Sequence, residues 1–158
     1  MKKVIKMELI PIKKTTAENQ AFIEHPDCQE SIYMTIFYFE RAGFYPPWIA
    51  YYAQVEGKLV GAAAFKGKAQ AGKVEIAYGT FPQYRKQGIG TEMCRKLVIL
   101  SQQTDPQILI TARTLPENKA SVSILKKNGF ELLGRIWDKE DGNVLEWKYT
   151  KSNVPDVV

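Results

Sequence analysis

The hydrophobic period of the chain changes once between Tyr51 and Leu100, and this change restricts the possible folds more than any other feature. Three apolar runs with turn residues between them, at 51–55, 59–65 and 74–81, have the pattern of an antiparallel strand meander. Apolar residues then recur at helical spacing, at Ile89, Met93, Leu97 and Leu100. A sheet followed directly by a helix predicts a fold that mixes both element types.

The remaining segments extend this sheet at both ends. Met7 to Ile12 and Ile108 to Ala112 are predicted strands, and Thr15 to Gly43 is mostly helical with a break near Pro26. A second helix is predicted over 116–128 and two closing strands over 131–137 and 144–149. With 158 residues, the chain has the length of one α/β (α+β) domain, predicted at 1–150 with a C-terminal tail at 151–158.

A glycine-rich basic loop joins the third strand of the meander to the helix. It reads Arg85-Lys86-Gln87-Gly88-Ile89-Gly90-Thr91. Free backbone N–H groups at a helix start form an anion site, and glycine lets a phosphate approach the main chain. The spacing differs from a Walker A loop, which needs Gly-Lys-Ser/Thr, and from the dinucleotide fingerprint, whose third glycine is replaced by Met93.

The net charge of the chain is concentrated around this loop. Eight basic and three acidic residues lie between Arg85 and Lys127, which equals the whole formal excess of +5, and the rest of the chain is balanced. This distribution predicts that an anionic ligand binds in this stretch and argues against a nucleic-acid-binding module, since no groove-reading helix or aromatic-basic strand motif is present.

Composition excludes several other classes of site. Cys28 and Cys94 are far apart and fit neither a disulfide framework nor a zinc site, and the single His25 excludes a multi-histidine metal site, so no metal is expected. The first twelve residues lack the apolar run of a secretory signal, and no apolar stretch approaches the ~20 residues that span a bilayer. We therefore expect a cytoplasmic protein without membrane contacts.

Two motifs together resemble the GCN5-related N-acetyltransferase (GNAT) superfamily. Arg85-x-x-Gly88-x-Gly90 resembles its acetyl-CoA pyrophosphate loop, and Asn118-x-x-Ser121 followed by Leu125 to Phe130 is similar to its later motif. Glu75 to Tyr78 and the Asn-x-x-Ser form resemble the branch that contains the ribosomal-protein N-terminal acetyltransferases. The resemblance covers roughly residues 54–149.

The resemblance implies a mixed, mostly antiparallel sheet with helices on both faces and two splayed parallel central strands. It implies acetyl-CoA as cosubstrate, with the pantetheine arm between the strands at 74–81 and 108–112. It further implies main-chain pairing with that arm at Tyr78, Gly79 and Thr80, a contact from Asn118, and pyrophosphate binding by the loop. The predicted cofactor-binding residues are Tyr78, Gly79, Thr80, Arg85, Lys86, Gln87, Gly88, Ile89, Gly90, Thr91 and Asn118.

Acetyl transfer needs a base for the amine, a donor for the carbonyl oxygen and an acid for the leaving thiolate. Glu75 is the predicted base, with Glu140 as second choice, and a backbone N–H near Thr80 is the candidate oxyanion donor. Many relatives carry a tyrosine acid where this chain has Leu125. Ser121 is the predicted substitute, and Tyr33 and Tyr78 are alternatives.

The sequence does not identify the acceptor amine. Aromatic residues concentrated at 33–48 are candidates for its pocket, and it is a small-molecule amine or a protein N-terminus. The chain is expected to act as a monomer or a homodimer. The leading prediction is an N-acetyltransferase that works through a ternary complex, and the replacement at Leu125 motivates an alternative, an acyl-CoA-binding sensor without catalytic activity.

Overall fold

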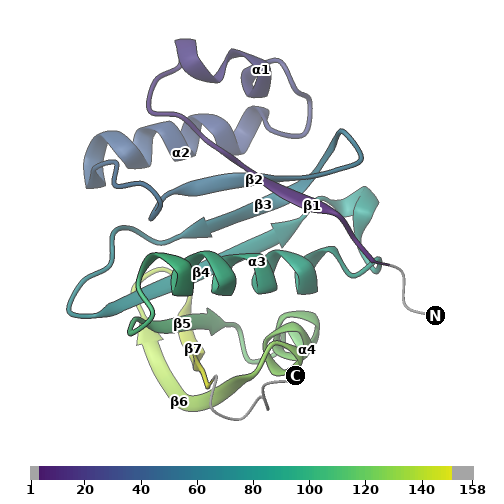
Figure 1. Cartoon of the computed structure of the whole chain (residues 1–158). Helices are drawn as coiled ribbons and strands as arrows, with labels where there is room; N and C mark the ends of the chain where they lie inside the picture. The colour runs from purple at the N-terminus through teal and green to yellow at the C-terminus, as the bar shows by residue number, and fades with distance from the viewer. Residues whose placement is uncertain (1–3, 151–158) are drawn as a thin grey trace.

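The computed structural model describes residues 4–150 of the chain. Seven strands and four α-helices, with two short 3-10 turns, follow one another in one domain (Figure 1). In chain order they are β1 (Met7–Pro11), η1 (Ala17–Asn19), α1 (Gln20–Ile23), α2 (Gln29–Ala42), β2 (Ala50–Val55), β3 (Lys58–Phe65), β4 (Lys73–Thr80), η2 (Pro82–Tyr84), α3 (Ile89–Thr104), β5 (Leu109–Thr114), α4 (Lys119–Lys127), β6 (Phe130–Asp138) and β7 (Gly142–Tyr149).

The strands form one sheet in the order β1-β2-β3-β4-β5-β7-β6. All neighbours are antiparallel except β4 and β5, which run parallel and pair only from Lys73↔Leu109 to Ile76↔Ala112. Beyond these residues β4 continues along β3, and β5 continues along β7. A gap therefore opens in the middle of the sheet, and the expected pair of splayed parallel strands is confirmed.

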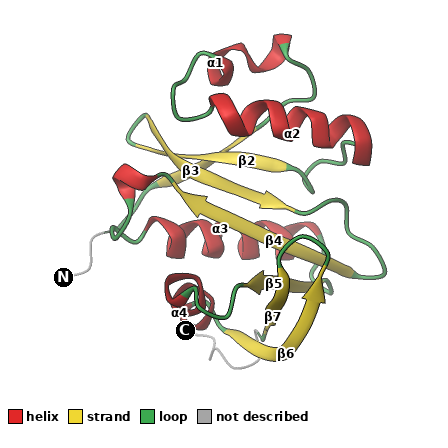
Figure 2. Ribbon diagram, turned by 180° about the vertical axis from the view of Figure 1, so that it is seen from behind, coloured by secondary structure: helices red, strands yellow, loops and turns green. Residues whose placement is uncertain are grey.

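Helices cover both faces of the sheet, as expected. In Figure 1, α3 lies in front of the sheet and α2 behind it, and the order is reversed in Figure 2. Side-chain contacts agree with this arrangement. Tyr52 of β2 reaches Ser31 of α2, with 2.6 Å between the hydroxyl oxygens, whereas Gly61 of β3 lies against Met93 of α3.

The element boundaries differ from the sequence-based ranges mainly around α4. A helix was expected from Pro116, but α4 begins at Lys119 because Asn118 has non-helical dihedral angles and caps it, its Oδ1 accepting the Ser121 N–H at 3.1 Å. Strand β5 continues to Thr114, two residues further than expected, because it pairs with β7 beyond the gap. None of the described helices is long and apolar enough to cross a membrane.

One buried hydrogen bond fixes β5 against β7 beside the gap. The indole Nε1 of Trp147 donates to Thr114 Oγ1 at 3.0 Å, and both residues are buried. We expect Thr114→Val to lower the free energy of unfolding by about 1–3 kcal/mol, because valine leaves the indole N–H without an acceptor. Urea denaturation measures this change. Thr104→Val, which removes an exposed hydroxyl on α3, is the matched control, and an equal loss there would contradict the assignment.

Candidate active site

A cleft of about 740 Å³ lies where β4 and β5 separate, between the N-terminal ends of α3 and α4. It unites most of the residues predicted to bind the cofactor, although they come from three separate segments of the chain. Its lining includes Tyr78, Gly79, Thr80, Arg85, Lys86, Gly88, Ile89, Gly90, Thr91, Asn118 and Ser121. Five further lining residues were not among the predicted cofactor-binding or catalytic residues: Tyr84, Ala120, Ser123, Ile124 and Lys127.

The N-terminus of α3 supplies the anion-binding part of this cleft. Gly88 precedes the helix in the left-handed conformation, with φ of +82°, and no side chain caps the first turn. The first N–H groups of this sixteen-residue helix are therefore directed outward at the positive end of its dipole. The exposed Arg85 and Lys86 precede it, so the expected phosphate loop has the required donors and charge.

The second glycine of the loop also has a packing role. A Cβ atom at Gly90 would lie 2.7 Å from Ile124 Cδ1 of α4, so this glycine lets the two helices approach each other. Gly90 is buried, whereas Gly88 is exposed. Gly90 also lines the cleft, so its contact with α4 adds to the predicted ligand role and does not replace it.

Main-chain groups of β4 are directed into the gap at alternate residues. The N–H of Phe81 donates to Val60 of β3, and Thr111 Oγ1 of β5 donates to the carbonyl oxygen of Val74, so odd positions face β3 and even positions face β5. Tyr78 and Thr80 therefore present polar main-chain groups to the gap. The Gly79 carbonyl oxygen lies against Gly61 of β3, so its predicted pairing with a ligand does not agree with its main-chain direction.

Three residues of the α4 motif lie in different environments. Asn118 caps the helix through Oδ1, which leaves its amide nitrogen to contact a ligand. Ser121 lines the cleft, and because Asn118 is the cap, the serine hydroxyl is not needed for that purpose. Leu125 is completely buried in the core, so the position of the usual tyrosine acid has a packing role here.

The two alternative tyrosine acids are poorly placed. Tyr33 is half exposed on α2, on the other side of the sheet from the cleft. Tyr78 lines the cleft, but its hydroxyl oxygen is buried and has no hydrogen-bond partner among residues 4–150. Burial, together with the neighbouring Cys94 thiol, raises the pKa of Tyr78 well above its usual value. Burial likewise raises the pKa of Cys94 to about 12, so this thiol stays protonated.

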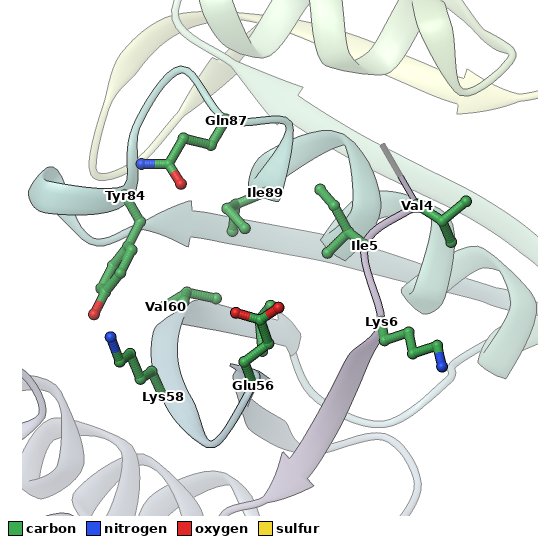
Figure 3. Close-up of a pocket in the computed structure, with 10 residues that line it drawn as sticks. Val4, Ile5, Lys6, Glu56, Lys58, Val60, Tyr84, Gln87 and Ile89 are labelled. Atoms are coloured by element: carbon green, nitrogen blue, oxygen red, sulfur yellow. The ribbon is translucent and has the colours of Figure 1, made fainter. Parts of the chain in front are cut away.

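Gln87 is the loop residue that does not line the cleft. Its side chain lines a second cavity of about 720 Å³ between the loop, the β2–β3 turn and the segment before β1 (Figure 3). Tyr84 and Ile89 contribute to both cavities. If Gln87 contributes to phosphate binding as predicted, it does so through its backbone and not through its side chain.

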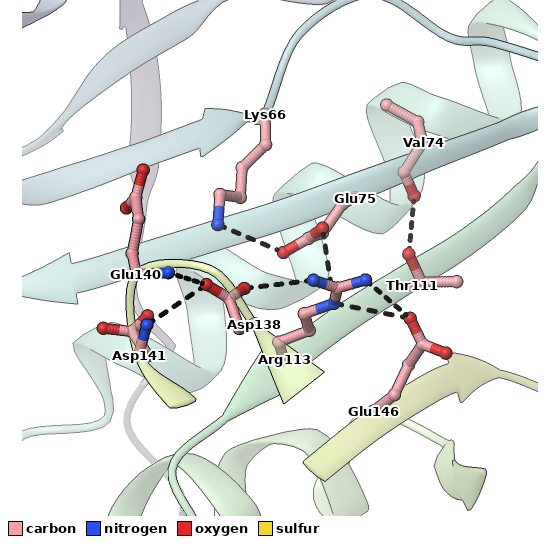
Figure 4. Close-up of polar contacts among 9 residues, drawn as sticks. All are labelled: Lys66, Val74, Glu75, Thr111, Arg113, Asp138, Glu140, Asp141 and Glu146. Atoms are coloured by element: carbon pink, nitrogen blue, oxygen red, sulfur yellow. Dashed lines mark hydrogen bonds and ion pairs between the residues drawn. The ribbon is translucent and has the colours of Figure 1, made fainter. Parts of the chain in front are cut away.

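Glu75 lies on the other face of the sheet from the cleft. On β4 it alternates with Ile76, Tyr78 and Thr80, and Thr80 faces Gly90 of α3. Its carboxylate lies between two cations, with Lys66 Nζ 3.3 Å from Oε2 and Arg113 Nε 3.9 Å from Oε1 (Figure 4). Because its register partner Thr111 directly precedes the last paired residue of β5, Glu75 stands at the closed end of the gap.

Arg113 is held more firmly by two other carboxylates. Its Nη1 donates to Asp138 Oδ2 at 3.0 Å, and its Nε lies 3.5 Å from Glu146 Oε2. Asp138 Oδ1 accepts the backbone N–H groups of Glu140 and Asp141, and these bonds with Arg113 hold the pKa of Asp138 below its usual value. Glu140, the second choice of base, contributes only its backbone to this cluster and is exposed in the turn.

The charge around the cleft is smaller than the sequence segment indicates. Arg85, Lys86 and Lys127 line it, but Arg113 lies on the opposite face and Arg95 is paired with Glu92 at 2.8 Å. Arg113 is therefore neutralised by carboxylates outside the 85–127 segment, whereas the Arg95–Glu92 pair is already balanced within the count of +5. Strand alternation is the signal that would have found Arg113, because Glu75 pairs with Thr111 and the next residue on the same face of β5 is Arg113.

The aromatic residues at 33–48 divide between core and surface. Phe39 packs edge-on against Phe44, with 5.0 Å between ring centroids, and Trp48 packs against Phe65 at the same distance. Phe37 and Tyr45 are exposed. Of the predicted aromatic acceptor pocket, only the exposed side chains remain available to a ligand.

No group of His, Cys, Asp and Glu among the described residues could hold a metal ion.

Comparison with known families identifies a match over most of the chain. A family model described as "Acetyltransferase (GNAT) domain" matches residues 3–131. None of the curated protein sequences compared with the chain is similar enough to count as a match.

Solved structures share the fold at low sequence identity. The chain is similar to an aminoglycoside acetyltransferase AAC(6')-Ib in complex with coenzyme A (TM-score 0.65, 19% identity, 93% of this chain and 96% of that chain). It is also similar to a chimera of spermidine N-acetyltransferase SpeG from Vibrio cholerae and hSSAT (TM-score 0.70, 13%, 92% and 96%). A third is RimL, a ribosomal L7/L12 alpha-N-protein acetyltransferase, with coenzyme A (TM-score 0.66, 15%, 90% and 92%). These similar scores do not distinguish one branch, so the predicted branch stays a prediction.

Proposed function

The chain belongs to the GNAT acetyltransferase family and is an acetyl-CoA-dependent N-acetyltransferase, and we propose that it transfers the acetyl group directly to a primary amine while both substrates are bound. The observation that carries this proposal is the gap between β4 and β5. A cleft suited to a polyanionic cofactor lies at this gap on one face of the sheet, and the Glu75 carboxylate lies on the other face at its closed end. Direct transfer needs this arrangement, because donor and acceptor meet without a covalent enzyme intermediate.

The described residues fit acetyl-CoA by the chemistry of their donors. Arg85, Lys86 and the uncapped α3 N-terminus would hold the pyrophosphate, and the gap-facing main chain of Tyr78 and Thr80 would pair with the pantetheine amides. Asn118 would contribute its amide nitrogen. Bound acetyl-CoA supplies an activated thioester.

We propose that the domain carrying this site spans residues 1–150, while the expected tail at 151–158 lies outside the described residues.

Three groups of this chain would assist the transfer. Glu75 accepts a proton from the acceptor amine, directly or through a water molecule. The Thr80 N–H donates to the acetyl carbonyl oxygen as it gains charge, because it points into the gap, where the pairing of β4 with β5 has already ended at Ile76. Ser121 donates to the leaving thiolate. The cleft provides no stronger acid at Leu125, and a thiol pKa of about 8.5 makes a strong acid unnecessary.

The serine role predicts a moderate loss of activity. We expect Ser121→Ala to lower kcat roughly tenfold with little change in KM for acetyl-CoA, because a thiolate is a tolerable leaving group without a strong donor. Release of free thiol, measured with a thiol reagent, reports this rate. Ser123→Ala is the matched control, since Ser123 also lines the cleft on α4. A parent-like rate in Ser121→Ala would remove this residue from the mechanism.

The acceptor class is proposed from the proteins of similar fold. These proteins are named as acetyltransferases of aminoglycosides, of spermidine and of a ribosomal-protein N-terminus. We propose a small-molecule amine or a protein N-terminus as acceptor, for an enzyme acting in the cytoplasm as a monomer or homodimer. The two free, buried cysteines agree with a reducing compartment.

A thiol-release assay over defined amines tests the function. The parent protein is mixed with acetyl-CoA and, in turn, spermidine, paromomycin and a short peptide with a free N-terminus. We expect release with at least one of them at a rate well above that with water alone. Binding of acetyl-CoA without release over the whole panel would contradict the proposal and favour a non-catalytic acyl-CoA sensor, the alternative that the buried Leu125 motivates.

A further inference from the structure

Lys66 places a primary ammonium group on the proposed catalytic base. Its backbone N–H donates to the Glu75 carbonyl oxygen at 2.8 Å, so the two residues lie opposite each other on neighbouring strand ends. Both side chains lie on the same face, and Nζ lies 3.3 Å from Oε2. The acceptor in the proposed reaction is also a primary amine, so Lys66 carries the same chemical group as the substrate at the same carboxylate.

The two cations next to Glu75 differ in how many carboxylates they contact and in how exposed they are. Arg113 is anchored by Asp138 and Glu146, and 27% of its side chain is exposed. Lys66 contacts only Glu75 among the ion pairs of the described residues, and 47% of its side chain is exposed. Exposed lysine ion pairs contribute about 0–1 kcal/mol, so another ammonium group can displace Lys66 easily, whereas Arg113 stays in place.

Figure 4 shows that Lys66 and Arg113 approach the Glu75 carboxylate from different sides. Lys66 reaches Glu75 from the β3–β4 connection, and Arg113 reaches it from the side of β5. Departure of Lys66 therefore opens the side of the carboxylate that Arg113 does not cover. Oε2 then has lone pairs free for an incoming amine.

We propose that the acceptor binds in its ammonium form in place of Lys66 Nζ, so that Lys66 is an internal competitor of the acceptor at Glu75. This inference rests on the proposed function, in which Glu75 is the base. It names the substrate class at this position as a protonated primary amine. It also assigns Lys66 a specificity role, because weakly basic or poorly positioned amines do not displace it.

Removal of the competitor is expected to strengthen acceptor binding. In Lys66→Met, the KM for the acceptor that gives the fastest thiol release falls about two- to fivefold, the factor that a surface ion pair contributes, while KM for acetyl-CoA is unchanged. Lys66→Arg keeps a cation and should not lower the acceptor KM. Lys68→Met is the matched control, because Lys68 lies over the Tyr45 ring rather than on Glu75. An unchanged or raised acceptor KM in Lys66→Met would overturn the inference.

A double-mutant cycle separates this role from a structural one. In a Glu75→Gln background, Lys66→Met should leave the acceptor KM unchanged, since the carboxylate for which the two amines compete is absent. An equal decrease in both backgrounds overturns the inference and leaves the proposed function standing. Thiol release with none of the three amines in the parent protein overturns the proposed function itself and the inference with it.

Discussion

Acetyl-CoA is expected to raise the melting temperature of the parent protein by about 5–10 °C and that of Gly88→Asp not at all. A ligand at 100 times its Kd stabilises the folded state by about 2.7 kcal/mol, and each kcal/mol shifts the melting temperature of a domain this size by about 2–4 °C. The aspartate would place a negative charge at the uncapped N-terminus of α3, where the pyrophosphate is proposed to bind.

Two further variants separate charge from backbone conformation. Gly88 has a φ of +82°, and a Cβ there would lie 3.4 Å from Ile5 Cδ1, so any side chain strains this position. Gly88→Asn has nearly the same shape without the charge and should retain part of the ligand-induced shift. Gly57→Asp introduces the same residue at a φ of +76° in the open β2–β3 turn and should retain all of it. No shift in the parent protein would contradict cofactor binding in the cleft.

Glu75→Gln is expected to lower kcat about 10²- to 10⁴-fold, the usual contribution of a general base, with little change in the KM for acetyl-CoA. Glutamine keeps the shape of the side chain and removes its ability to accept the amine proton. The fold should persist, because Arg113 keeps its contacts with Asp138 and Glu146. Thiol release at saturating acceptor measures the effect, and the melting temperature of the variant confirms that it is folded.

The appropriate control for this variant comes from the same cluster. Glu146→Gln removes another carboxylate that contacts Arg113, on β7 rather than at the closed end of the gap. It should reduce kcat by less than tenfold. If both variants lose activity equally, the cluster has a structural role and Glu75 is not the base.

Local pattern was sufficient to predict the strand meander from Tyr51 to Phe81 and the helix that follows Gly88. The gap between β4 and β5 was expected only from the family resemblance, and the structure places its start next to Ile76. These features depend on neighbouring residues or on a motif with known spacing. Helix α4 was placed three residues too early, because its start depends on a cap at Asn118 that periodicity does not reveal.

The residues that line the cleft follow more directly from the sequence than the surroundings of Glu75 do. The loop from Arg85 to Thr91 is contiguous, so its residues had to lie together once the helix was placed. The Glu75 environment joins the β3–β4 connection with strands β5, β6 and β7, and no short motif records that Lys66 and Arg113 meet there. The close contact between Gly90 and Ile124 of α4 is likewise absent from any short motif, because the two residues lie far apart in the sequence.

The alternation of side chains along β4 places two chemically different surfaces on one strand. Tyr78 and Thr80 project toward the cleft, whereas Glu75 and Ala77 project toward the opposite face. Under the proposed function, a substitution at Ala77 would change the face that carries Glu75 and leave the side chains of Tyr78 and Thr80 in place. The two faces of the strand can therefore be altered independently by single substitutions.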